Sequence, residues 1–198
     1  MQKEFSLLFH YFYDIITIME RWHSKEGHRM GIYFNPNHTD FYNAVNHSQI
    51  YVDKTKLIQY TNSVLFGEQK YICVSRPRRF GKSMAANMLT AYYSRGCDSK
   101  ELFQDLKIAI HPDFEKHLNQ YNVIHLNMQS FLSKTQTIEQ MIALVTKAVG
   151  RDLLRAYPDI DYLDKSILTF MLDDVYQNYQ VPFIFIIDEW DCIFRSRK

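Results

Sequence analysis

The chain has 198 residues, of which 46% are hydrophobic and 15% aromatic, and this content is enough for one sizeable core. Its 23 Lys and Arg residues nearly balance 22 Asp and Glu residues, so no overall field draws the chain to nucleic acid or to an anionic membrane. Six glycines and five prolines are too few for a disordered chain, and the three cysteines show no C-x-x-C spacing. These features predict a folded cytoplasmic protein without a disulfide framework or a zinc site.

The first segment, residues 1–29, is predicted to be a helical extension, and residues 30–198 are predicted to form one domain. Charged and titratable residues interrupt the apolar run of residues 1–22, which therefore falls short of the ~18 uninterrupted apolar residues of a membrane-spanning helix. No small-residue cleavage site follows, which argues against a secretory signal. We interpret the segment as a helix that lies on the surface or docks on the core.

The next part of the chain predicts a loop, a helix and a strand in that order. Residues 31–46 contain the turn signal "NPNH" and are expected to be a loop. Asp53 stands where an N-cap would precede a helix over residues 54–65, and Gly67 would end that helix. The apolar run "KYICVS" (residues 70–75) is then expected to be a buried strand.

The middle of the chain continues the alternation of helices and strands. The sequence "KSMAANMLTAYYSRG" predicts a helix from Lys82 that Gly96 stops. Residues 101–120 predict short helical pieces broken at Pro112, and "NVIHLNM" (residues 122–128) predicts a second buried strand.

Two helices and a third strand complete the pattern. Thr137 and Gln140 form a capping box ahead of a helix over residues 138–156, and a further helix is expected over residues 162–179. The run "VPFIFIIDEWD" then supplies an apolar strand that ends in two carboxylates. Strands that alternate with helices predict an α/β fold with a parallel sheet covered on both faces.

One stretch, "SRPRRFGKS" (residues 75–83, the basic loop), joins the first predicted strand to the helix that follows it. A phosphate site needs converging backbone N–H groups, a helix N-terminus, a lysine and a hydroxyl for magnesium, and this loop supplies all of them in order. The pattern G-x-x-x-x-G-K-[ST] requires glycine where this chain has Arg76, and Pro77 lacks an N–H. A basic surface turn is the alternative, although its cationic side chains would repel one another without an anion.

The second signal is the acidic pair that ends "FIFIIDE". In P-loop ATPases an apolar strand ends in an aspartate of the magnesium shell, often followed by a glutamate that polarises the attacking water. Asp188 and Glu189 occupy these two positions. An ordinary loop start would explain the pair by itself, but together with the basic loop the pair indicates nucleotide binding.

Four segments together resemble one known group of proteins. The segments "YVDKTKLI", "YICVSRPRRFGKSMAANML", "VIHLNMQSF" and "FIFIIDEWD" look like those of the bacterial AAA-ATPase-like proteins, in which R-P-R-R-F-G-K-[ST] is the usual form of the loop. The resemblance covers about residues 30–194 and accounts for Arg76. It implies a P-loop NTPase fold of three α/β/α layers with a parallel sheet, of the additional-strand, AAA-like type.

The resemblance also implies a Walker A and a Walker B site for ATP and Mg²⁺. Lys82 would contact the β- and γ-phosphates, Ser83 and Asp188 would hold Mg²⁺, and Glu189 would activate water. The remaining nucleotide contacts would come from the basic loop and the start of the helix, at Arg78, Arg79, Phe80, Gly81 and Met84. At least one of Arg76, Arg78 and Arg79 is expected to touch a phosphate, since a guanidinium suits that geometry.

Three further positions carry titratable side chains near these motifs. Lys54, in the segment "DKT", is expected to be an exposed lysine after an N-cap at least as much as a functional residue. His125 lies within an apolar strand and is expected to be a hydrogen-bonded core histidine. Asp191 is expected to cap the segment that follows it rather than to assist Asp188.

The chain departs from the family pattern at its end. In the implied fold two more strands follow the acidic pair, and one of them lies between that strand and the strand before the basic loop. The chain is therefore expected to be an N-terminal portion that lacks the last strands, the sensor residues and the arginine elements. Members of the group often continue into a nuclease-like domain of the PD-(D/E)XK type, which is not found in this sequence.

The leading functional hypothesis is an ATP-binding domain that hydrolyses ATP in the full-length protein and couples hydrolysis to an effector. The alternative is a nucleotide-dependent binding module without turnover, which the missing strands favour. A small-molecule kinase ranks third, because a glutamate directly after the magnesium aspartate suits water activation better. The expected partner is a nucleotide, with an effector or nuclease-like domain outside this chain; an oligomer is compatible with the sequence, whereas a membrane and direct nucleic-acid binding are not expected.

Overall fold

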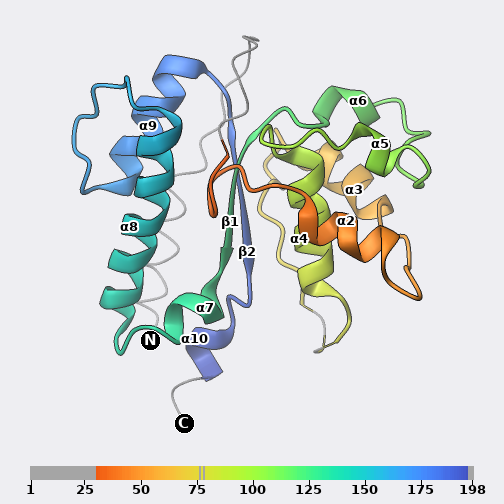
Figure 1. Ribbon diagram of the computed structural model, residues 1–198, viewed down its shortest axis with the longest axis horizontal. Coiled ribbons are helices and arrows are strands. Elements are labelled where there is room, and N and C mark those ends of the chain that lie inside the picture. The colour runs from red at the N-terminus through yellow and green to blue at the C-terminus, as the bar shows by residue number, and fades with distance from the viewer. Residues whose placement is uncertain (1–29, 76, 78, 196–198) are drawn as a thin grey trace.

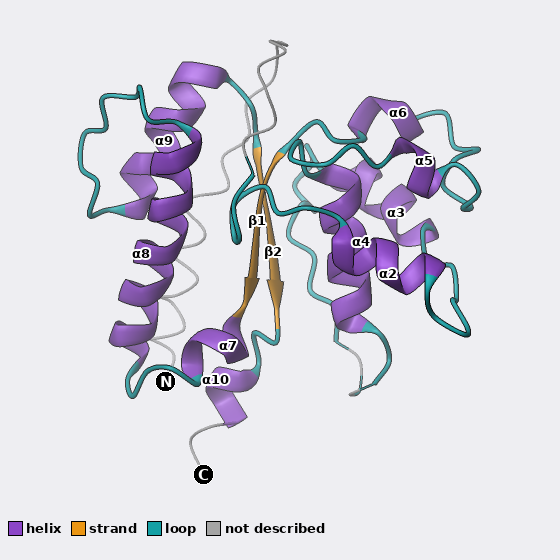
Figure 2. Cartoon of the chain, viewed as in Figure 1, coloured by secondary structure: helices purple, strands orange, loops and turns teal. Residues whose placement is uncertain are grey.

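The computed structural model describes residues 30–75, 77 and 79–195, and these form a mixed α/β structure around a two-stranded parallel sheet (Figures 1 and 2). Strand β1 (Asn122–Asn127) pairs with strand β2 (Phe183–Asp188) in register from the first residue of each strand to the last. The expected segment of residues 1–29 lies outside the described residues. The two strands run in the same direction, so their carboxyl ends meet at one end of the sheet.

Helices cover both faces of this sheet. The described helices are α2 (Thr39–Asn46), α3 (Lys56–Val64), α4 (Lys82–Tyr93), α5 (Lys100–Phe103), α6 (Phe114–His117), α7 (Met128–Leu132), α8 (Ile138–Ala156), α9 (Leu168–Tyr179) and α10 (Cys192–Arg195). Figure 1 shows α8 and α9 on one side of the strands, α2 to α6 on the other, and α7 and α10 at the carboxyl ends. None of the described helices is both long and apolar enough to cross a membrane.

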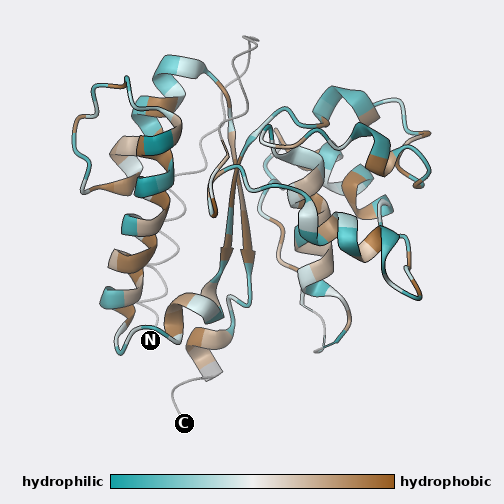
Figure 3. Cartoon of the chain, viewed as in Figure 1, coloured by the Kyte–Doolittle hydropathy of each residue, from teal (hydrophilic) through white to brown (hydrophobic). Residues whose placement is uncertain are grey.

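The alternation of side chains along each strand divides the interior into two cores. Ile124 and Phe183 are buried on the side of α8 and α9, whereas Val123 and Ile186 are buried on the side of α4. Strand β2 is hydrophobic along most of its length (Figure 3), because helices cover the sheet on both faces. The alternation also decides which side each polar residue at the strand ends faces.

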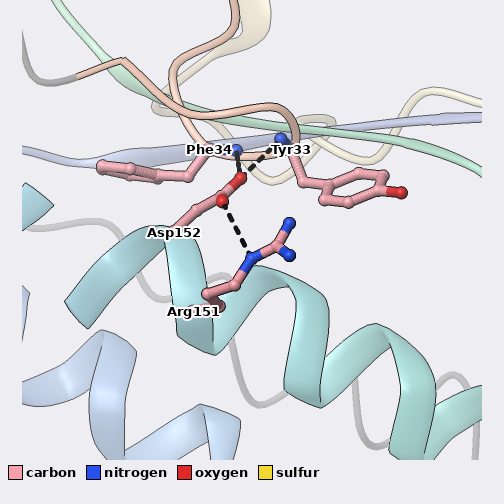
Figure 4. Close-up of polar contacts among 4 residues, drawn as sticks. All are labelled: Tyr33, Phe34, Arg151 and Asp152. Carbon is pink, nitrogen blue, oxygen red and sulfur yellow. Dashed lines mark hydrogen bonds and ion pairs between the residues drawn. The ribbon is translucent and has the colours of Figure 1, made fainter. Parts of the chain in front are cut away.

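A short N-terminal segment lies along the outer edge of β1. Phe34 forms an antiparallel bridge with Ile124, and the N–H of His125 donates to the Tyr33 carbonyl at 2.9 Å. A buried carboxylate of α8 holds this segment: Asp152 Oδ2 accepts the N–H of Tyr33 at 2.8 Å (Figure 4). The edge of β1 is thus covered without a third strand.

Most predicted elements are confirmed. The two strands at residues 122–128 and 181–188, the helix after the basic loop and the helix from residue 138 all lie where the pattern placed them. Thr137 Oγ1 accepts the Gln140 N–H at 3.2 Å, as a capping box predicts. The reciprocal bond differs, since Gln140 Oε1 accepts the N–H of Gln136 at 2.9 Å.

Two predictions for the part of the chain before residue 70 were wrong. The expected loop of residues 31–46 contains α2. Phe41 on this helix is fully buried, and its apolar contacts with the core stabilise the helix. Asp53 is not the N-cap of α3, which begins at Lys56. Its carboxylate instead accepts the Thr55 N–H at 2.8 Å and the Thr55 hydroxyl at 2.7 Å, which forms a turn ahead of the helix.

The helix expected over residues 162–179 begins only at Leu168. Asp164 Oδ1 accepts the Ser166 N–H at 2.7 Å, and Asp174 Oδ2 accepts the Leu163 N–H at 2.9 Å. These side chains accept backbone N–H groups in a non-helical conformation, so a turn replaces the expected first helical turns.

The expected strand of residues 70–75 is also not a strand in this structure. Tyr71, Ile72 and Val74 are 41%, 38% and 43% exposed, and the described part of the chain forms no sheet beyond β1 and β2. A strand needs a paired neighbour, and no described segment pairs with residues 70–75 or with the edge of β2 that faces away from β1. The structure therefore supports a mixed α/β fold with a small parallel sheet.

Candidate nucleotide-binding site

The basic loop turns into α4 through two residues with left-handed backbone conformation. Arg79 has φ 68°, and Gly81, the residue before α4, has φ 76° and ψ 34°. The Gly81 carbonyl accepts the Ala85 N–H at 3.0 Å, which begins the helical hydrogen-bond pattern. Left-handed residues that alternate with right-handed ones turn successive N–H groups toward one side and so form a concave anion site. The strained conformation of Arg79, a non-glycine residue, is of the kind that clusters at functional sites.

The first turn of α4 carries the lysine and hydroxyl of the motif. Lys82 and Met84 are partly exposed, and Ser83 and Phe80 are exposed. The N–H groups of a first helical turn have no partner within the helix and carry the positive end of its dipole. Loop and helix therefore offer an accessible N-terminus suited to an anion. Arg76 and Arg78 lie outside the described residues.

The rest of α4 is anchored in the core, which makes its N-terminus a fixed platform. The Tyr93 hydroxyl donates to Asn62 Oδ1 at 2.7 Å, and the Tyr92 hydroxyl donates to the Phe114 carbonyl at 2.7 Å. Burial raises the pKa of Tyr92 to about 12 and that of Tyr93 further, so both remain neutral donors.

The acidic pair comes from the end of β2. Asp188 continues the alternation of Ile184 and Ile186, and so it lies on the α4 side of the sheet, 7% exposed. Its Oδ1 accepts the N–H of Glu189 at 2.9 Å. Glu189 is partly exposed and has φ 52°, a third left-handed position among the predicted site residues.

The carboxyl ends of the strands and the N-terminus of α4 lie at the same end of the molecule (Figure 1). The fold thus brings the helix start with Lys82 and Ser83 to the end of the sheet that carries Asp188. Within the described ranges no group of three or more His, Cys, Asp or Glu side chains could hold a metal ion. A hydroxyl and one carboxylate fit Mg²⁺ better than metals that need a full protein cage, because Mg²⁺ usually keeps waters and substrate phosphates among its ligands.

Sequence reasoning did not identify Asn127, which is the register partner of Asp188 at the end of β1. By strand alternation it lies on the α4 side of the sheet, two residues after His125. Its Oδ1 accepts the Ser130 N–H at 3.1 Å and caps α7. A polar residue at the carboxyl end of a buried parallel strand was the signal that could have identified it.

His125 behaves as a hydrogen-bonded core histidine. Its Nδ1 lies 3.1 Å from Thr90 Oγ1 on α4. Burial lowers the pKa of His125 below its ordinary value, and the carboxylates of Asp188 and Asp40 partly oppose this shift. The ring lines a polar cavity of about 320 Å³ together with Asp40, Asn87 and Thr90.

A second lysine lies at the basic loop. Lys54 Nζ donates to the Phe80 carbonyl at 2.9 Å, although the two residues are 26 positions apart. Sequence spacing gave no means to predict this contact, which depends on how the segment before α3 packs against the loop.

Comparison with known families gives one match. The model of a family described as "Predicted AAA-ATPase" matches residues 37–196 of the chain. No curated protein and no solved structure matches it.

Proposed function

Because the chain belongs to the predicted AAA-ATPase family, we propose that it binds ATP with Mg²⁺ at the basic loop and that, in the full-length protein, this site hydrolyses ATP to ADP and phosphate. The observation that carries this proposal is the left-handed Gly81 at the start of α4, at the end of the sheet where Asp188 faces the same helix. The start of α4 would bind the phosphates, and Asp188 at the end of β2 would bind the metal ion. P-loop NTPases divide these two tasks between two elements in the same way.

Each residue of the loop has a distinct task in this proposal. The N–H groups from Arg79 through Ser83 and the start of α4 at Met84 would surround the β-phosphate, and Lys82 would reach the β- and γ-phosphates. Phe80 would contribute its backbone rather than its exposed ring, and Arg78 would add a guanidinium contact. Mg²⁺ would be held by the Ser83 hydroxyl and the Asp188 carboxylate.

Glu189 would act as the general base for the attacking water. It follows the magnesium aspartate directly, and its position after the strand end leaves its side chain partly exposed to solvent. A carboxylate polarises a water that it accepts a hydrogen bond from, and the water oxygen then attacks the γ-phosphorus as the bond to the β-phosphate oxygen breaks.

Completion of the site is proposed to involve a further strand. The apolar residues Tyr71, Ile72 and Val74 are exposed, and residues 70–75 lead directly into the basic loop. A strand placed between this segment and β2 would make β2 a central strand and would give residues 70–75 the neighbour they need to join the parallel sheet of a three-layer P-loop fold. Sensor and arginine elements, an effector or a PD-(D/E)XK nuclease-like domain would belong to the longer protein of which this chain is proposed to be the N-terminal portion.

The same exposed segment favours a second candidate, a nucleotide-dependent binding module without turnover. Nucleotide binding needs the loop and the helix N-terminus, whereas hydrolysis also needs the loop to be held firmly against Asp188 and Glu189. Residues 70–75, which carry the loop, are held by no strand partner among the described residues.

Release of phosphate from ATP tests the proposal. We expect Mg²⁺-dependent release by the full-length protein, loss of release in its Lys82→Ala variant, and loss of release with retained ATP binding in its Glu189→Gln variant. Glu101→Gln, on the exposed face of α5, is the matched control and should behave as wild type. Release that persists in Lys82→Ala and Glu189→Gln would contradict the proposal, saturable binding without release would select the binding module, and a phosphorylated acceptor would indicate a kinase.

A further inference from the structure

Lys54 packs against one peptide group of the basic loop. Its Nζ lies 2.9 Å from the Phe80 oxygen, and a Cβ added to Gly81 would lie only 2.7 Å from the same Nζ. The ammonium group is therefore close to both sides of the Phe80–Gly81 peptide bond. This peptide immediately precedes Lys82, the residue proposed to reach the outer phosphates.

The turn that carries Lys54 is firmly attached to the body of the protein. Asp53 Oδ1 accepts the N–H and hydroxyl of Thr55, and its Oδ2 accepts the Lys107 N–H at 2.8 Å. Thr55 is fully buried, and its Oγ1 accepts the Ile108 N–H at 3.1 Å. Although burial alone would raise it, these hydrogen bonds hold the pKa of Asp53 below its ordinary value, so the carboxylate stays ionised and keeps the turn fixed.

Lys54 itself is exposed, and its contact with the loop is unusual for a surface lysine. No carboxylate among the described residues forms an ion pair with it. An exposed lysine loses considerable side-chain entropy when it is held in one place, and a single neutral carbonyl uses only one of its three donors. The contact also places a further cation beside a loop that already carries Arg79 and Lys82.

The hydrogen bond has a direct effect on the backbone of the loop. The Phe80–Gly81 peptide is trans, so its carbonyl and the Gly81 N–H point in opposite directions. A donor that holds the Phe80 oxygen fixes the direction of the Gly81 N–H as well. Gly81 is the left-handed residue on which the concave shape of the loop depends.

From these contacts we propose that Lys54 is a positioning residue of the nucleotide site, which holds the Phe80–Gly81 peptide in its anion-binding orientation. This inference rests on the proposed function, since it concerns the same loop and ligand. Lys54 acts through the backbone, whereas Lys82 acts on the phosphates, so the two lysines have separable effects. The positive charge of Lys54 beside the loop adds attraction for a polyphosphate.

Titration of the purified chain with ADP and with ATP, each with Mg²⁺, tests this inference. We expect Lys54→Met to weaken the affinity for both nucleotides between about two- and tenfold, the range that follows from one hydrogen bond. Lys54→Arg should restore most of the affinity, because its guanidinium also donates to a carbonyl. Lys56→Met removes an exposed lysine two residues away and is the matched control. The melting temperature of each ligand-free variant should equal that of wild type, since Lys54 is exposed.

The outcomes separate this inference from the function on which it rests. Lys54→Met that binds as tightly as wild type, while Lys82→Ala does not bind, would overturn the inference and leave the nucleotide site intact. Equal losses in Lys54→Met and Lys56→Met would also overturn it, because the effect would then be one of general charge. A wild-type chain that binds no better than Lys82→Ala would overturn the proposed function and the inference together.

Discussion

Asn127 and Asp188 are register partners at the ends of β1 and β2, and both lie on the side of the sheet that faces α4. Parallel pairing brings them together, although 60 residues separate Asn127 from Asp188 in the sequence. Asn127 uses its side-chain oxygen to cap α7, and Asp188 accepts the N–H of the next residue. One polar and one acidic side chain thus end the sheet beside the proposed nucleotide site.

Asp188→Asn is expected to remove most of the gain in ATP affinity that Mg²⁺ provides. A neutral amide keeps the shape of the side chain but is a poor ligand for a hard cation, and we expect a loss of at least about tenfold in the presence of Mg²⁺. Affinity measured in EDTA should change little. Titrations with and without Mg²⁺ check this, with Asp161→Asn, an exposed carboxylate after α8, as the control. An unchanged Mg²⁺ effect would remove Asp188 from the metal site.

Asp152→Ala is expected to destabilise the fold by about 1–3 kcal/mol, the cost of leaving a buried polar group without its partner. The substitution removes the acceptor of the Tyr33 and Phe34 N–H groups, which lie 2.8 and 3.4 Å from Asp152 Oδ2 (Figure 4). Urea unfolding measures the difference. Arg151→Ala is the matched control: its Nε lies 3.8 Å from Asp152 and its side chain is 50% exposed, so we expect less than about 1 kcal/mol. Equal effects of the two substitutions would contradict this account.

Two glycines predict opposite responses to alanine. A Cβ at Gly96 would lie 2.3 Å from the Asn35 carbonyl oxygen, a backbone atom that cannot move aside without disturbing the segment beside β1. We expect Gly96→Ala to lower the free energy of unfolding by about 1–3 kcal/mol. A Cβ at Gly67 would make only ordinary contact, 3.6 Å from the Val64 oxygen, so Gly67→Ala should be neutral or slightly stabilising. Thermal denaturation of both variants measures these effects. A Gly96→Ala variant as stable as wild type would contradict the predicted clash with the Asn35 carbonyl oxygen.

The free energy of unfolding is expected to fall as the pH is lowered below ~6.5, because His125 is harder to protonate in the folded protein than in the unfolded chain. The unfolded chain binds a proton on His125 near pH ~6.5, whereas the folded protein does so only at lower pH because burial lowers the pKa. The contribution of neutral His125 to the free energy of unfolding is therefore complete above pH ~6.5 and is lost as the pH falls below that value. The negative charges of Asp188 and Asp40 moderate this lowering of the pKa, and the Thr90 hydroxyl lies 3.1 Å from Nδ1 of the ring.

The check is urea unfolding at pH 7.5 and 5.5 of wild type and His125→Asn. The variant should lose less stability between the two pH values, although not none, because burial also lowers the pKa of His117. An identical pH dependence of the two proteins would show that His125 does not contribute to it.

The sequence predicted those parts of the fold whose residues carry their own signal. The apolar run before Asp188 forms a strand and the periodic segment from Ile138 forms a helix, as expected. A continuous apolar run is typical of a strand buried on both faces, and a helical period of apolar residues is typical of a helix buried on one side. Residues 70–75 carry the same kind of signal as β2, yet no described strand pairs with them, and composition cannot report the presence of a neighbour. Helix α2 was not predicted, because turn signals precede it and it contains a single buried residue, Phe41, which is too few to produce a helical period of apolar residues.

The candidate site shows the same division. Lys82, Ser83 and Asp188 follow from motifs, because their order along the chain is fixed by the chemistry of phosphate and magnesium. The contact between Lys54 and the Phe80 carbonyl, and the pairing of Asn127 with Asp188, come from tertiary packing and strand register. Neither is visible in a linear pattern, since both depend on distances between segments far apart in the chain.

The most direct measurement of the central claim is calorimetric titration of the wild-type chain and Lys82→Ala with ADP and ATP in the presence of Mg²⁺. Lys165→Ala, an exposed lysine after α8, serves as the charge-matched control. We expect both nucleotides to bind saturably to wild type and to Lys165→Ala, and this binding to be lost in Lys82→Ala. Binding that is equal in all three proteins, or a folded wild-type chain that binds neither nucleotide, would contradict it.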